Sequence, residues 1–156
     1  ASTLADKVWP YVRNAAAAAL GRIGAPAATP EILARLATLL DDRTPDVRNA
    51  AAIAVGGIGA PAATPEILVR LAKLLADQDL YVRLAVVKAV GRIGAPAATP
   101  EILARLRKLH AWEFALSEEA AIALNRLMCE GIRVYWRRGR VVAHSLDDTH
   151  RELGLL

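Results

Sequence analysis

The sequence predicts an all-α protein, a right-handed α-solenoid of two-helix repeats with a period of 35 residues and a small C-terminal β-hairpin cap. The block GRIGAPAATPEILARL occurs at 21–36 and again, letter for letter, at 91–106. A third copy at 56–71 differs only at Gly57 and Val69, and successive copies start 35 residues apart. A unit of this length holds two helices and cannot bury its apolar face alone, so consecutive copies are expected to stack.

The first helix of each repeat is expected to begin at a Thr-Pro-Glu sequence, as at Thr29. Threonine caps free backbone N–H groups, proline suits the first helical position, and glutamate complements the helix dipole. The apolar residues that follow fall on one face of the helix. They are Ile32, Leu33, Leu36, Leu39 and Leu40. The opposite face carries Glu and Arg four residues apart, as in Glu101 and Arg105, and is expected to be solvated.

The second helix is expected to begin near Pro45 and to end at Gly59, because glycine followed by proline terminates a helix. Its many small residues allow neighbouring helices to approach closely. The glycines do not indicate a phosphate-binding loop, since they follow a helix and no Gly-Lys-Ser/Thr sequence is present. Helices are therefore predicted at 30–42, 45–58, 65–76, 80–93, 100–110 and 117–129.

Both ends of the array differ from its centre. Thr3-Leu4 aligns with Thr38-Leu39, so the first unit is truncated. Either the chain belongs to a longer array or this segment replaces a cap. We assign residues 1–130 to the array and 131–156 to a C-terminal hairpin and a short helix of the same domain. This tail is expected to fold over the end of the array and seal its core.

The sequence Pro-Asp-Val-Arg-Asn-Ala-Ala at 45–51, followed by Gly-Gly-Ile-Gly at 56–59, resembles HEAT repeats. It is most similar to the short bacterial type named after phycobilin lyases, over roughly residues 4–128, although its Ala-Pro-Ala-Ala-Thr-Pro loop is longer. The resemblance implies that the second helices line the concave face. It also implies that Arg13, Arg48 and Arg83 pair with an aspartate near the inter-helix turn. The tail resembles the ends of HEAT-carrying bacterial NACHT-type ATPases, which would make this chain a sensor fragment of a larger protein.

Positions that vary between the second helices indicate a binding surface. They recur at i, i+4 and i+8 and therefore share one face of each helix. We interpret this face as a concave site for a protein partner; the alternative is drift on a solvated face. The predicted partner-binding residues are Tyr11, Asn14, Arg22, Asn49, Ile53, Tyr81, Leu84, Lys88 and Arg92.

The hairpin offers an alternative function, nucleic-acid binding through residues 131–143. This segment contains aromatic residues and no acidic residue, a combination that can contact phosphates and stack bases. Its basic residues are Arg133, Arg137, Arg138 and Arg140. The other interpretation is that the rings seal the last repeat and the arginines keep a hairpin edge soluble.

The remaining composition argues against catalysis and against a membrane. The net charge of +4 is too small to imply nucleic acid by itself, and one cysteine, Cys129, excludes an internal disulfide. His110, His144 and His150 complete the soft-metal candidates, without a helical zinc spacing. We therefore expect a non-enzymatic cytoplasmic scaffold without metal, cofactor, signal peptide or membrane span. A designed consensus array or a recent duplication would also leave identical blocks.

Overall fold

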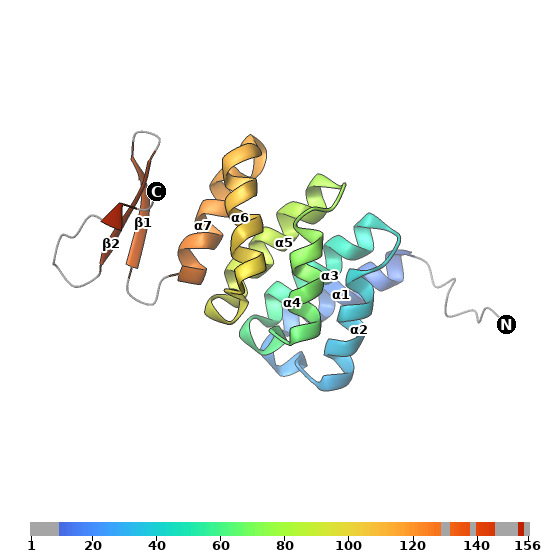
Figure 1. Ribbon diagram of the computed structural model, residues 1–156. Helices are drawn as coiled ribbons and strands as arrows, with labels where there is room; N and C mark the ends of the chain where they lie inside the picture. Colours follow the sequence, from blue (N-terminus) through green and yellow to red (C-terminus); the bar gives the residue numbers. More distant parts are fainter. Residues whose placement is uncertain (1–9, 129–131, 138–139, 146–152, 155–156) are drawn as a thin grey trace.

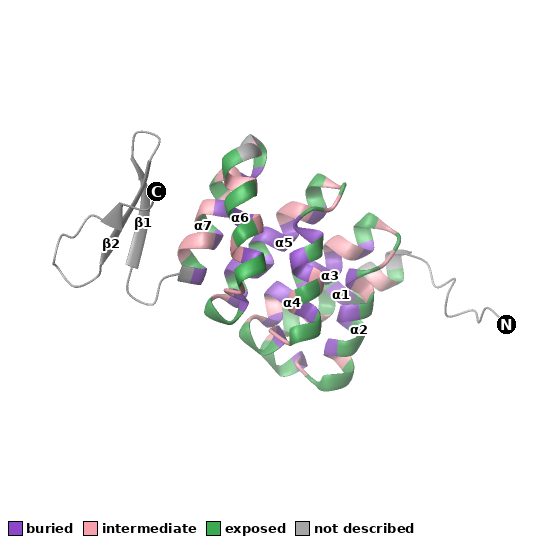
Figure 2. Ribbon diagram, in the orientation of Figure 1, coloured by how far each residue is buried: buried purple, intermediate pink, exposed green. Residues whose placement is uncertain are grey.

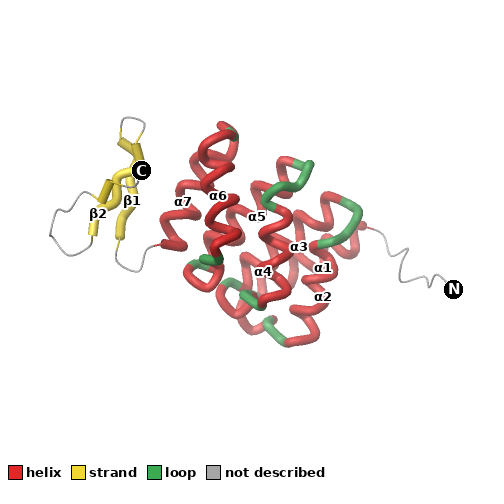
Figure 3. Tube along the Cα trace, in the orientation of Figure 1, coloured by secondary structure: helices red, strands yellow, loops and turns green. Residues whose placement is uncertain are grey.

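The computed structural model describes the backbone of residues 10–128, 132–137, 140–145 and 153–154, and side chains at 12–13, 15–111, 113 and 115–127. The described residues hold seven α-helices joined by short loops (Figure 3). These are α1 (Pro10–Ile23), α2 (Pro30–Leu40), α3 (Pro45–Ile58), α4 (Pro65–Leu74), α5 (Leu80–Ile93), α6 (Pro100–Trp112) and α7 (Ser117–Met128). The six predicted helices are confirmed, each end within two residues.

The helices form two layers, as expected for an α-solenoid. The second helices α1, α3, α5 and α7 pack side by side in one layer, and the first helices α2, α4 and α6 form the other (Figure 1). Leucine and isoleucine of the first helices meet valine and alanine of the second between the layers, where the buried residues gather (Figure 2). Leu36, Leu71 and Leu106 occupy the same position in three successive units and are fully buried.

The ends of the helices follow the predicted local chemistry. The Thr29 side chain accepts a hydrogen bond from the backbone N–H of Ile32 at 3.3 Å, and the equivalent threonines at 64 and 99 do the same. Gly59 ends α3 with a φ of +75°, a conformation that residues with a Cβ rarely adopt. The repeated Ala-Pro-Ala sequence then forms a 3₁₀ turn, as at Ala60–Ala62.

Small residues bring the second helices unusually close together. A Cβ built at Gly57 of α3 would lie 2.2 Å from the backbone oxygen of Gly21 on α1. A Cβ at Gly56 would lie 2.8 Å from the Cα of Ala89 on α5. Backbones therefore touch directly along this layer, as the predicted small-residue packing requires.

One face of α1 remains exposed although its equivalents are buried. Val12 and Ile23 are 54% and 58% exposed, whereas Val47 and Ile58, one repeat later, are 0% and 3% exposed. The difference arises because α3 packs against α2, the first helix of its own repeat, while no helix among the described residues occupies the corresponding place beside α1.

Among the described residues, three strands follow the array. Strand β1 (Ile132–Arg137) pairs antiparallel with β2 (Arg140–Ser145), and β3 (Leu153–Gly154) pairs with β2. The short helix predicted after Ser145 falls on residues 146–152, which lie outside the described residues. The described strands do not establish that the tail covers the end of the array, so its predicted role as a cap that seals the core stays a prediction.

Candidate functional site

Three arginines, one on each of the second helices α1, α3 and α5, connect that helix to the following repeat. They are Arg13, Arg48 and Arg83, and we call them and their acidic partners the arginine ladder. Arg48, on α3, donates from Nε and Nη2 to both carboxylate oxygens of Asp77, at 2.9 and 3.0 Å. Its Nη1 donates to the backbone oxygens of Asp42 and Arg43, at 2.8 and 3.2 Å. One guanidinium therefore joins the turn before its own helix to the turn of the following repeat.

The neighbouring arginines repeat this arrangement. Arg13 Nε lies 3.2 Å from Asp42 Oδ2, and Arg83 pairs with Glu113 while donating to the backbone oxygen of Asp77 at 2.7 Å. The pairing implied by the family resemblance is thus confirmed for Arg13 and Arg48. At Arg83 the acid is a glutamate, one residue later than the period of 35 would place it.

Asp77 stands at the centre of the ladder. Burial raises the pKa of its carboxyl group, but several interactions with the ionised form act in the opposite direction. These are hydrogen bonds from Arg48 and from the backbone N–H of Asp79, together with the positive charges of Arg48 and Arg83. The net result is a pKa below the ordinary value, so this carboxylate stays ionised and holds the turn in place.

A groove lies between α3 and α5, on the face that the variable positions indicate. It has a volume of about 270 Å³, and Gly56, Ala85 and Ala89 supply the small residues of its lining. The rest of the lining consists of six of the nine predicted partner-binding residues. They are Asn49, Ile53, Tyr81, Leu84, Lys88 and Arg92.

The side chains of this groove are available to a ligand. Tyr81 is 70% exposed, and Ile53 is also among the large exposed apolar residues. Lys88 and Arg92 are exposed, and within the described part of the chain neither forms an ion pair or a hydrogen bond. Apolar surface and unpaired cations therefore lie together on one pair of packed helices.

The other predicted residues lie outside the groove. Arg22 is exposed on α1, and the side chains of Tyr11 and Asn14, on the same helix, are outside the described residues. Gly57, which aligns with Arg22 and Arg92 of the neighbouring repeats, faces Gly21, and the close approach of the two backbones leaves no room for a Cβ there. Of the hairpin residues, Arg133 and Arg137 lie in β1 and Arg140 pairs with Arg137. Their side chains, like the whole of Arg138, lie outside the described residues.

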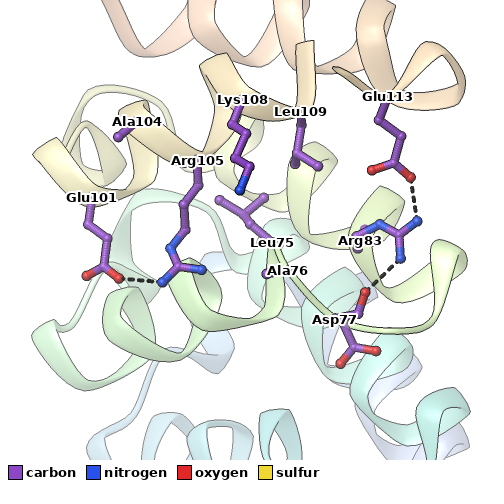
Figure 4. A pocket seen from close by; sticks show the side chains of 10 residues that line it. All are labelled: Leu75, Ala76, Asp77, Arg83, Glu101, Ala104, Arg105, Lys108, Leu109 and Glu113. Atoms are coloured by element: carbon purple, nitrogen blue, oxygen red, sulfur yellow. Dashed lines mark hydrogen bonds and ion pairs between the residues drawn. The ribbon is translucent and has the colours of Figure 1, made fainter. Parts of the chain in front are cut away.

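A larger cavity, of about 790 Å³, lies between the α4–α5 turn and α6 (Figure 4), where the repeat pattern predicts no site. Most of its charged groups already have partners. Arg83 pairs with Glu113, and Arg105 Nη2 donates to Glu101 Oε1 at 3.0 Å. Lys108 is the exception among the charged lining residues. A charged ligand would have to compete with these internal pairs, so the α3–α5 groove is the better candidate despite its smaller volume.

The described residues show no cluster of three or more His, Cys, Asp and Glu side chains placed to hold a metal ion. His110 has a structural contact, with its Nδ1 2.8 Å from the backbone oxygen of Ser117. No helix in the described part of the chain has the length and apolar character needed to span a bilayer.

Comparison with known proteins agrees with the repeat architecture. The HEAT-repeat family matches residues 2–71 and again residues 33–125. No curated protein and no solved structure matches the chain. The two family matches together span more than half of the sequence and cover the layers of paired helices described above. The chain therefore belongs to the HEAT-repeat family.

Proposed function

We propose that this chain is a non-enzymatic protein-interaction scaffold whose partner binds in the groove between α3 and α5. HEAT repeats commonly serve as such scaffolds. The observation that carries the proposal is that two independent criteria, variation between the repeats and the position of the groove, select the same residues. Variation between the repeats selects a set of residues, and six of its members line a single groove.

The composition of the groove suits a protein partner. Tyrosine and arginine are the residue types most often found at the energetic centres of interfaces, because they combine large contact area with polar groups. Tyr81 and Arg92 project from a helix whose position is fixed by the Arg48–Asp77 and Arg83–Glu113 pairs. A surface held in this way loses little conformational entropy on binding.

The experiment compares two exposed apolar positions on opposite layers. A photo-crosslinking amino acid, p-benzoylphenylalanine, replaces Tyr81 on α5 or Val69 on α4, which are 70% and 66% exposed. In cells that make the protein, we expect a crosslinked protein partner from position 81 and not from position 69. The same adduct from both positions, or an adduct from position 69 alone, would contradict the proposal.

A further inference from the structure

We infer that the α3–α5 groove selects an acidic partner segment: an extended peptide with an apolar residue followed, two and four positions away, by carboxylates. The inference rests on the proposed function and adds the chemistry of the partner. Three features of the groove lead to it, namely its charge, the spacing of its side chains and its size.

The groove is lined by two cations, Lys88 and Arg92, and by no acidic residue. Six acidic side chains elsewhere in the described chain form ion pairs with arginine or lysine. Asp42, Asp77 and Glu113 belong to the arginine ladder, while Asp41, Glu66 and Glu101 pair with cations of the first helices. The other described acidic residues, such as Glu31, Asp46 and Glu118, form no ion pair in the described chain, but none of them lines the groove, so its two cations remain available to an anion.

Arg92 alone would be weak evidence, because it lies in the last turn of α5, where a cation also complements the helix dipole. Arg22 and Arg126 hold comparable places at the ends of α1 and α7. The α3–α5 groove differs in having a second unpaired cation, Lys88, one helical turn before the arginine. The groove therefore presents two adjacent unpaired positive charges beside apolar surface, and an acidic segment would neutralise these charges.

The spacing of the side chains matches an extended chain. Leu84, Lys88 and Arg92 follow each other at i, i+4 and i+8 on α5, so they share a face and are separated by about 6 Å along the helix. Alternate residues of an extended peptide are separated by about 6.6 Å and also share a face. A peptide lying along α5 can therefore place an apolar residue at Leu84 and carboxylates at Lys88 and Arg92.

The polar groups of the groove suit these contacts. Arg92 can bind a carboxylate through two parallel hydrogen bonds, whereas Lys88 attracts it as a point charge. The half-buried amide of Asn49, on α3, offers both a donor and an acceptor to the backbone of the peptide. Tyr81 and Ile53 provide the exposed apolar surface beside Leu84.

The size of the groove suits a single side chain of a larger partner. Its volume of about 270 Å³ is smaller than the roughly 300–1,000 Å³ of sites that enclose a drug-sized molecule. It can hold one large apolar side chain, while the flanking carboxylates stay at its polar rim.

The test is a selection of random twelve-residue peptides displayed on phage against the full chain, followed by affinity measurement of the enriched peptides by fluorescence anisotropy. We expect enrichment of Asp and Glu two and four positions from an apolar residue. Lys88→Glu combined with Arg92→Glu should weaken such a peptide at least about tenfold, and lysines in place of the peptide's acids should restore binding to that variant. The control is Arg35→Glu combined with Arg107→Glu, which changes the net charge equally at two exposed positions of α2 and α6.

The outcomes separate this inference from the proposed function. One outcome is that the enriched peptides bind Tyr81→Ala weakly but contain no excess of acidic residues, or bind the variant with reversed charges at 88 and 92 as well as the unmodified chain. That outcome would overturn the acidic selectivity and leave the groove as the binding site. Enriched peptides that bind the Tyr81→Ala variant normally would place the site elsewhere and contradict the proposed function as well. A selection that enriches no sequence would overturn the inference.

Discussion

Replacing Arg48 by alanine removes four hydrogen bonds that connect two repeats. The guanidinium donates to both carboxylate oxygens of Asp77 and to the backbone oxygens of Asp42 and Arg43. Asp77 would keep its hydrogen bond from the backbone N–H of Asp79, at 2.9 Å, but would lose its bidentate partner.

The magnitude follows from the burial of the pair. The side chains of Arg48 and Asp77 are 17% and 8% exposed, so the carboxylate left behind is largely shielded from water. Breaking a fully buried ion pair costs about 3–5 kcal/mol, and a hydrogen bond to a charged group contributes about 1.5–3 kcal/mol. Because water can reach part of this site, we expect Arg48→Ala to lower the free energy of unfolding by about 1–3 kcal/mol. The free energy of unfolding of Arg48→Lys should lie between those of Arg48→Ala and the unmodified chain, since lysine keeps the charge but cannot bind both carboxylate oxygens of Asp77.

The assay is urea denaturation followed by far-ultraviolet circular dichroism. Arg35→Ala is the matched control, because Arg35 is exposed on α2 and forms no ion pair among the described residues. It should change the free energy of unfolding by less than about 0.5 kcal/mol. An Arg48→Ala midpoint equal to that of the control would show that the ladder does not contribute to stability and would refute the reasoning.

Four further predictions test the fold and the alternative function. Ile58→Ala should cost about 2–5 kcal/mol of stability in urea denaturation, and the exposed equivalent Ile23→Ala under about 1 kcal/mol; equal losses would mean that the exposure of α1 is wrong. Gly57→Ala should lower stability by at least about 1 kcal/mol despite the better helix propensity of alanine, because its Cβ meets the Gly21 backbone; a more stable variant would contradict this packing. The pKa of Asp77 is lowered in the folded state, so its carboxylate stabilises the fold at pH values above the unfolded pKa of about 3.9, and this contribution is lost as the pH falls through the folded pKa. On acid titration, Asp77→Asn should therefore lose less free energy of unfolding than the unmodified chain. A generic oligonucleotide should show no detectable binding at low salt, and steeply salt-dependent binding would instead favour the basic hairpin.

The repeats made most of the fold predictable from the sequence. Thr29 with its following proline, and Gly59 before Pro61, are local signals whose effect does not depend on distant residues, so the helix ends could be placed closely. The groove was partly predictable for a similar reason. Residues at i, i+4 and i+8 share a helix face in any context, which placed Leu84, Lys88 and Arg92 together.

Features that depend on the angle and distance between helices were not predictable. The spacing of Glu66 and Arg70 predicts a pair on one helix, of the same kind as Glu101 and Arg105, but Arg70 also donates to Asp41 of the preceding repeat at 2.7 Å. The larger cavity beside α6 likewise arises from the way that helix lies against the α4–α5 turn. Gly57 falls on the variable face of the second helices, and nothing in the sequence reveals how closely α1 and α3 approach at this position.

The central claim is that the partner binds the layer of second helices and not the layer of first helices. The most direct measurement is the affinity of the captured partner for Tyr81→Ala, for Arg92→Ala and for Glu101→Ala combined with Arg105→Ala. We predict a loss of more than about 1 kcal/mol for each groove variant, with an unchanged melting temperature, and no loss for the outer pair. Weakened binding of the outer variant with normal binding of both groove variants would contradict the account.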